Sequence, residues 1–223
     1  GLGQGLDQVA RVQTPAVGQV GGDGHQHGGL AAQLRAQDHH SRGAQLVAHV
    51  QGRFATLPIL VHCAATGVHR PLDPLTLRHF DWTFGLNARA FFDLVLQLLP
   101  RFDAQGGSVL ALSAARATRA IPQYAVVGAS KGALEALVRH MAVEIAPRGI
   151  RVNTLSCGSV QTDAWKSMPD AEKRLAETCR RSPIGRMVTL DEVAWTAQFL
   201  CSDAASGIVG QAVVVDGGVR IVA

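Results

Sequence analysis

The sequence has few aromatic and few charged residues for its length of 223 residues. Aromatic residues make up 5% and charged residues 17%, while hydrophobic residues make up 47%, a balance typical of a globular rather than a disordered chain. It lacks an apolar run of the roughly 18 to 20 residues that a membrane-spanning helix needs. It also lacks the basic-then-apolar start of a secretion signal. We therefore expect one soluble, cytoplasmic domain with a core of its own.

Cysteine is scarce as well, and its spacing excludes the common metal motifs. Cys63, Cys157, Cys179 and Cys201 lie far apart, without a C-x-x-C pair, which favours reduced thiols over a zinc site. His62 next to Cys63 offers no ligand pair either, because neighbouring residues of a strand point to opposite faces. We therefore expect no metal.

The net charge of +4 does not predict a nucleic-acid partner. The basic residues are scattered along the chain, and there are too few aromatic side chains for a platform on which bases could stack. We therefore expect no nucleic acid among the partners.

The composition changes near residue 43. Residues 1–43 are rich in Gly, Gln and His and show poor hydrophobic periodicity, whereas strand-like apolar runs alternate with amphipathic helical runs over 44–223. Such alternation predicts an α/β fold, a single doubly wound, Rossmann-like parallel sheet covered by helices. The ligand of such a sheet lies beyond the carboxyl ends of its strands.

Short apolar runs predict strands at 58–63, 107–113, 150–156 and 211–216. Amphipathic runs predict helices at 44–54, 77–99 and 124–146. A further helix is expected after Thr189, whose side chain can cap the first turn while Glu192 bonds back to it.

The stretch 113–153, SAARATRAIPQYAVVGASKGALEALVRHMAVEIAPRGIRVN, carries the residues that suggest chemistry. A serine ends a strand, and Tyr124, the single tyrosine of the chain, precedes Lys131 by seven residues. This order resembles the short-chain dehydrogenase/reductase family. In the general pattern of that family the tyrosine lies four residues before the lysine, where this chain has Val127, which can donate no proton.

The seven-residue interval resembles the enoyl-acyl-carrier-protein reductase branch of the family, and the nearest likeness is to its type III. Three further runs are similar to that type, at 64–72 (AATGVHRPL), 79–90 (HFDWTFGLNARA) and 185–193 (GRMVTLDEV). The resemblance implies NAD(P)H-dependent reduction of a trans-2-enoyl thioester, in fatty acid or polyketide biosynthesis. It also implies a homo-oligomer, either a dimer or a tetramer.

The longer interval suits this chemistry. If both residues lie on a helix, it moves the hydroxyl about one turn, about 5 Å, farther from the lysine. In ketone reduction, the carbon that takes the hydride carries the oxygen that takes the proton. In enoyl reduction, the oxygen to be stabilised lies on the thioester carbonyl, away from the β-carbon that takes the hydride. A displaced hydroxyl therefore fits an enoyl thioester.

The resemblance also implies roles for single residues. Tyr124 would hydrogen-bond the developing enolate oxygen, and Lys131 would hold the nicotinamide ribose and favour a usable tyrosine pKa. Ser113 would support the site, and Asn87 would prop a water near the lysine. Further expected cofactor contacts are Cys63 and Ala64 at the adenosine, Asp38 at the adenine, and Val160 and Thr162 at the nicotinamide amide.

Each of these residues also has a plain structural interpretation. Lys131 could be a solvated helix lysine, Ser113 and Asn87 could satisfy backbone groups, and Asp38 could be an ordinary loop acid. Two other functions stay open as well. One is a ketone or alcohol oxidoreductase of the same family, against which Val127 and Ala114 argue. The other is a non-catalytic remnant that acts as a binding protein.

The resemblance is weakest where the cofactor's phosphates would bind. The glycine turn that cradles pyrophosphate is not recognisable before residue 43, so the first βα unit is atypical or missing. A truncation, a divergent start and a wrongly translated frame would each account for this. His62 and Cys63 replace the family's usual Asn-Asn pair, and Pro58 replaces an aspartate. The expected cofactor is NADPH, from the type III likeness, with NADH not excluded.

Two surface features bear on partners. Residues 161–186 carry a small excess of basic side chains, which would attract an acidic acyl-carrier protein, although a solvated helix face with mixed charges is the plainer explanation. The helix at 124–146 has a second apolar stripe, which favours self-association unless its residues enter the monomer's own core. The stripe consists of Leu134, Leu137, Met141 and Ile145.

Overall fold

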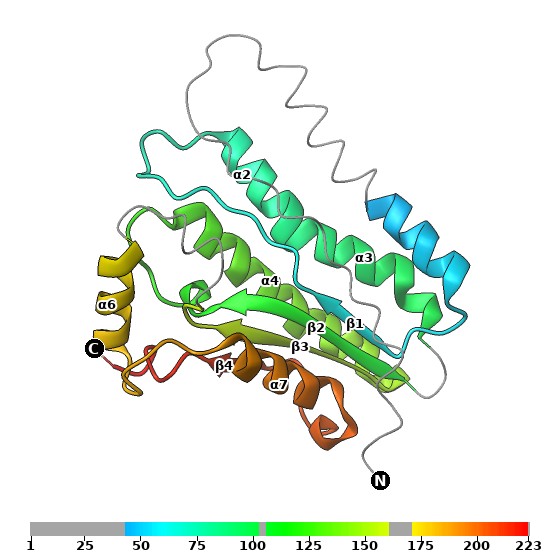
Figure 1. Ribbon diagram of the computed structural model, residues 1–223. Coiled ribbons are helices and arrows are strands. Elements are labelled where there is room, and N and C mark those ends of the chain that lie inside the picture. The colour runs from blue at the N-terminus through cyan, green and yellow to red at the C-terminus, as the bar shows by residue number, and fades with distance from the viewer. Residues whose placement is uncertain (1–42, 103–105, 161–170, 223) are drawn as a thin grey trace.

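The computed structural model describes residues 43–102, 106–160 and 171–222 (Figure 1). Its four strands are β1 (Ile59–His62), β2 (Gly107–Ala114), β3 (Ile150–Cys157) and β4 (Ala212–Val215). They form one parallel sheet in the order β1-β2-β3-β4. Because the strands run in one direction, their carboxyl ends meet at one edge of the sheet.

Helices cover both faces of this sheet (Figure 1). A helix over 43–53, α2 (Leu77–Phe84), α3 (Ala90–Leu98) and α4 (Ala125–Ile145) lie on one face, and α7 (Leu190–Cys201) lies on the other. Each face has its own core: Val109 of β2 packs with Phe91 and Leu134 on the first face, while Leu110 packs with Leu200 on the second. The predicted doubly wound α/β architecture is confirmed.

The predicted helix at 77–99 is interrupted where the site residue Asn87 lies. After α2 the chain makes a π-helical turn, Gly85–Arg89, before it continues as α3. A π turn holds one more residue per turn than an α-helix and often marks a functional position. Here it carries Asn87, whose side chain is fully buried.

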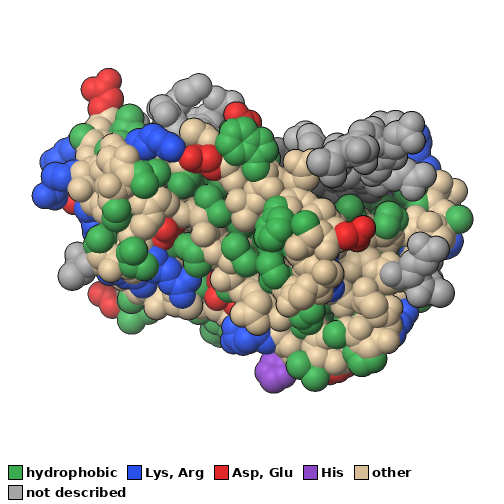
Figure 2. Space-filling model, turned by 90° about the horizontal axis from the view of Figure 1, so that it is seen from below, with side chains coloured by type: hydrophobic (Ala, Val, Ile, Leu, Met, Phe, Trp, Pro, Cys, Tyr) green, Lys and Arg blue, Asp and Glu red, His purple; other side chains and the backbone are tan. Residues whose placement is uncertain are grey.

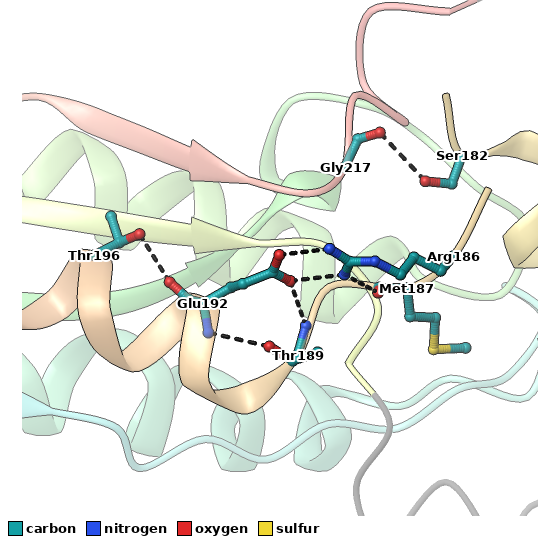
Figure 3. Close-up of polar contacts among 7 residues, drawn as sticks. All are labelled: Ser182, Arg186, Met187, Thr189, Glu192, Thr196 and Gly217. Carbon is teal, nitrogen blue, oxygen red and sulfur yellow. Dashed lines mark hydrogen bonds and ion pairs between the residues drawn. The ribbon is translucent and has the colours of Figure 1, made fainter. Parts of the chain in front are cut away.

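The start of α7 agrees with the predicted capping box (Figure 3). The Thr189 hydroxyl accepts from the Glu192 N–H at 3.2 Å, and the Glu192 carboxylate accepts from the Thr189 N–H at 2.8 Å. Arg186 adds two bonds to the same carboxylate, and these contacts lower the pKa of Glu192 to about 2. The helix therefore begins at a fixed point beside the carboxyl edge of the sheet.

One predicted segment lies outside the described residues, and one observed helix was not predicted. The atypical segment 1–43 and its βα unit fall outside, except for Gly43. Helix α6 (Ala171–Arg181) was not singled out from the sequence. Within the described ranges, no helix is long and apolar enough to cross a membrane, and no three His, Cys, Asp or Glu side chains cluster as metal ligands.

Candidate active site

The carboxyl edge of the sheet gathers residues that are far apart in sequence. Cys63 follows β1, Ser113 and Ala114 end β2, and Cys157 ends β3. Ala114 lies directly opposite Cys157 in the β2–β3 ladder. Helix α4 packs across β2 and β3 and brings its own polar residues to this edge.

Lys131 of α4 is buried at this edge, with 6% of its surface exposed. Its ammonium donates a hydrogen bond of 2.7 Å to the carbonyl oxygen of Leu112 in β2. Burial lowers the pKa of Lys131 to about 8, while Cys157, Cys63 and Glu135 act in the opposite direction. The alternative of a solvated surface lysine is therefore wrong.

Tyr124 lies at the N-terminus of α4. Its φ of −121° and ψ of 11° place it just outside the helix, which begins at Ala125 rather than at Tyr124 as predicted. Its carbonyl oxygen accepts the first helical bond, from the Gly128 N–H at 2.8 Å. Burial raises the pKa of Tyr124, and nearby Arg116 partly offsets this. The phenol therefore stays protonated at neutral pH and can donate a hydrogen bond.

The surroundings of Tyr124 leave room for a ligand. The Tyr124 ring meets the His69 ring edge to face, with 5.0 Å between centroids and 78° between planes. A cavity of about 320 Å³ lies between residues 116–121 and the first turns of α4, and Tyr124 is part of its lining. The Tyr124 ring is thus positioned by its contact with His69 and lies at the edge of this cavity.

Asn87 connects the loop after β1 to α4. Its Oδ1 accepts from the Thr66 N–H at 2.8 Å, and its Nδ2 donates to the Thr66 carbonyl at 2.8 Å and to Ser130 Oγ at 2.9 Å. Gly67 then packs so closely on Val127 that a side chain at this position would overlap it. Because both amide hydrogens are used in these bonds, Asn87 fixes the loop wall of the site through Thr66, a contact that sequence reasoning missed.

Ser113 is directed towards α4. Its hydroxyl donates a hydrogen bond of 2.6 Å to Oε1 of Glu135, and both side chains are buried. Sequence reasoning did not single out Glu135. The available signal was its position, one helical turn after Lys131 on the same face.

His62 is a second buried polar residue that sequence reasoning left without a role. It is 4% exposed, meets Phe91 edge to face at 5.5 Å between ring centroids, and neither ring nitrogen has a hydrogen-bond partner among the described residues. Burial, and then the charge of Lys131, lower the pKa of His62 to about 4. The imidazole is therefore neutral at working pH.

The other expected cofactor contacts stay predictions, and the structure describes the positions of some of them. Cys63 is exposed and Ala64 half-buried beside the end of β1, and Val160 is half-buried, where it forms an isolated parallel bridge with Val188. Asp38 and Thr162 lie outside the described residues.

The C-terminal residues close one side of this region. Arg119, in the loop before Tyr124, donates through Nη1 to the carbonyl oxygens of Val219, Arg220 and Val222 at 2.8 to 3.0 Å. Ser182 donates to the Gly217 carbonyl at 3.2 Å (Figure 3). Three segments therefore lie together here: the loop before Tyr124, the segment at Ser182 and the C-terminal residues 217–222.

The described residues fit the nicotinamide ribose of a dinucleotide. The Lys131 ammonium spends one of its three N–H donors on Leu112, so two are available to hydroxyl groups. Gly158, directly after β3, lies close to the end of β4, since a Cβ there would be 2.8 Å from the Asp216 Cα. The carboxyl edge of the sheet thus offers two N–H donors of Lys131 and, at Gly158, backbone that carries no side chain.

Comparisons with known proteins agree with this geometry. A family described as "Enoyl-(Acyl carrier protein) reductase" matches residues 32–220. The NADH-dependent enoyl-[acyl-carrier-protein] reductase FabI of Escherichia coli (strain K12) is 47% identical over 118 residues, which are 53% of this chain and 45% of that protein. A 1-cyclohexenylcarbonyl-CoA reductase of Streptomyces collinus is 37% identical over 176 residues, which are 78% of this chain and 62% of that protein. The chain thus spans about half to two thirds of the length of these relatives.

Solved structures have the same fold. The NADH-dependent enoyl-[acyl-carrier-protein] reductase of Aquifex aeolicus VF5 superimposes with a TM-score of 0.74 at 30% identity, over 81% of this chain and 72% of that one. A gluconate 5-dehydrogenase of Burkholderia cenocepacia J2315, in complex with NADP and tartrate, has a TM-score of 0.76 at 26% identity, over 82% and 72%. The fold alone therefore does not separate an enoyl reductase from a gluconate dehydrogenase.

Proposed function

Because the chain belongs to the enoyl-(acyl carrier protein) reductase family, we propose that it reduces a trans-2-enoyl thioester with a nicotinamide cofactor. The family resemblance drawn from the sequence is confirmed, while the narrower likeness to type III stays a prediction. The observation that carries the proposed reaction is the site itself. A protonated tyrosine lies at the start of α4, a buried lysine follows seven residues later, and Val127 replaces the tyrosine of ketone-reducing relatives.

The chain's own residues would stabilise charge on the thioester. Tyr124 would donate its hydroxyl proton in a hydrogen bond to the carbonyl oxygen, which becomes an enolate oxygen as the double bond is reduced. Lys131 would use its two remaining donors on the ribose hydroxyls, while Arg116 is the cation whose charge favours loss of the Tyr124 proton. When bound, a reduced nicotinamide would supply the hydride to the β-carbon, and a proton delivered from Tyr124 or from water to the enolate would complete the saturated thioester. Asn87, through Thr66, would keep the loop wall in place.

The form of the cofactor is a separate proposal. The sequence expectation was NADPH, with NADH not excluded. The FabI relative and the Aquifex structure carry NADH in their names, so we propose NADH as the first cofactor to test. Direct titration of the protein with each cofactor, followed by fluorescence, compares the two. If neither NADH nor NADPH bound, the result would favour the non-catalytic binding protein.

Among the described side chains of residues 171–186, two of the basic residues considered for docking of an acyl-carrier protein are paired with acids. Arg180 is paired with Glu177 at 2.6 Å and Arg186 with Glu192 at 2.7 Å. Lys173 and Arg181 remain exposed on α6. We propose that these two attract the acidic carrier. Reversing both charges should then raise KM for the carrier-bound substrate several-fold and leave KM for the coenzyme A analogue unchanged.

Self-association is proposed on a different surface from the predicted stripe. Leu134 and Ile145 are buried in the monomer's own core and Met141 packs against it, so the stripe argument is wrong for these three residues, and Leu137, which is half-buried, is the one member outside that core. Apolar side chains gather instead on the face that carries α7 (Figure 2), where Trp195 is 65% and Phe199 44% exposed. Light scattering should give a mass above the monomer, and Trp195→Glu should lower it. The cytoplasmic location stays a prediction.

The reaction is tested by comparing two thioesters. Oxidation of the reduced cofactor is followed with crotonyl and with acetoacetyl coenzyme A, for the unmodified protein and for Tyr124→Phe. The proposal expects turnover of the crotonyl thioester only, and its loss in Tyr124→Phe with cofactor binding retained. Activity restricted to the acetoacetyl thioester would establish the ketone reductase instead.

A further inference from the structure

Helix α4 buries two opposite charges one turn apart. Lys131 is 6% and Glu135 is 5% exposed, on a helix that otherwise buries residues such as Leu134 and Val138. A carboxylate is costly to remove from water unless hydrogen bonds and an opposite charge compensate it. A glutamate at this core position therefore calls for a physical reason.

Two adjacent residues of β2 hold the two charges. The Leu112 carbonyl accepts from Lys131 Nζ at 2.7 Å, and the Ser113 hydroxyl donates to Glu135 Oε1 at 2.6 Å. The second distance is in the range of a hydroxyl that donates to an ionised carboxylate. The end of β2 and one face of α4 are therefore locked together at both charged groups.

Lys131 faces groups from several elements. His62 ends β1, Cys63 follows it, Cys157 ends β3, and Glu135 lies on α4 itself. Burial raises the pKa of Cys157 to about 11 and lowers that of His62 to about 4, so both are neutral at working pH. Among the described groups that act electrostatically on Lys131, Glu135 is the only carboxylate.

We propose that Glu135 is a positioning residue whose buried carboxylate, held by Ser113, keeps Lys131 charged and in place at the end of β2. Its importance for turnover rests on the proposed function, in which the Lys131 ammonium binds the cofactor. Ser113 then acts through Glu135 and Lys131 rather than on the substrate. Loss of the carboxylate removes the one negative carboxylate that acts on the buried ammonium among the described groups, which favours the neutral amine.

The chain has three lysines, at 131, 166 and 173, so lysine carbons labelled with ¹³C give three signals that can be followed by NMR against pH. Lys131→Arg identifies the Lys131 signal. In the cofactor-free protein we expect its titration midpoint near the pKa of about 8, and in Glu135→Gln at lower pH. Glutamine keeps the size and the acceptor for Ser113. Glu144→Gln, an exposed site on the same helix, should leave the midpoint in place.

The second readout is the pH dependence of cofactor affinity. Affinity should fall as pH rises through the Lys131 midpoint, and in Glu135→Gln this fall should begin at lower pH by the same interval. Circular dichroism checks the folding of each variant. If Glu135→Gln fails to fold, Ser113→Ala replaces it, with a smaller downward shift expected.

An unchanged Lys131 midpoint in the folded variant would overturn the proposal. A lowered midpoint supports it whether or not the protein reduces enoyl thioesters, because the titration needs no turnover. Failure of the proposed reaction is therefore distinguishable from failure of this inference.

Discussion

His62 should make the protein less stable in acid, and replacing it should remove that sensitivity. The imidazole is 4% exposed, lies against Phe91 and has no hydrogen-bond partner among the described residues. Protonation would bury a positive charge close to the Lys131 ammonium. The substitution His62→Leu keeps an apolar side chain of similar size there and removes the titrating group.

The pKa of His62 sets the size and the sign of the effect. It falls from 6.5 to about 4, a difference of about 2.5 units, which corresponds to about 3 kcal/mol. Between pH 6.5 and 4 the unfolded chain binds a proton at this position that the folded protein does not. The free energy of unfolding therefore falls as pH drops through this window, and the contribution of His62 levels off below about pH 4.

The assay is urea unfolding followed by circular dichroism at several pH values between 7 and 4. The unmodified protein should lose about 3 kcal/mol more than His62→Leu across this interval. His140, which is exposed on α4, provides the control, since His140→Leu should keep the acid sensitivity of the unmodified protein. Equal pH dependence in His62→Leu and the unmodified protein would refute the reasoning.

Three further substitutions test the site and the fold. Tyr124→Phe should lower kcat for a crotonyl thioester by about 10²-fold or more, since the donor to the enolate oxygen is lost, and unchanged turnover would count against the assignment. Asn87→Ala should cost about 2 kcal/mol in urea unfolding because the Thr66 N–H loses its partner, and Asn87→Asp should cost at least as much, because its second oxygen would face the Thr66 carbonyl to which Nδ2 now donates. Gly106→Ala should cost at least about 2 kcal/mol, because Gly106 has a φ of +87° and a Cβ would overlap the Gly149 carbonyl. Its control is Gly52→Ala, in the helix over 43–53, where nothing lies within 4 Å and a gain of up to about 1 kcal/mol is expected.

Local patterns in the sequence were enough to predict most elements of this fold. The four strands and the helices other than α6 lie where the apolar runs predicted them, apart from the π turn between α2 and α3, because each run buries one face of a strand or helix. The capping box at Thr189 and Glu192 was also predictable, since its partners are three residues apart and bond within one turn. The family likeness rested in the same way on short runs around Tyr124 and Lys131.

The contacts that make up the site were decided by the tertiary structure. Ser113 and Glu135 are 22 residues apart, and Asn87 and Ser130 are 43 apart. No periodicity predicts that these side chains meet. Three further features likewise depend on how α3, α4 and the sheet pack: the π turn at Gly85–Arg89, the position of Tyr124 before rather than within α4, and the His62 ring, which has no hydrogen-bond partner among the described residues. Hydrophobic patterns specify which face of an element is buried, but hydrogen bonds and charge interactions act over a few ångströms. Their partners are therefore set only when the elements are brought together.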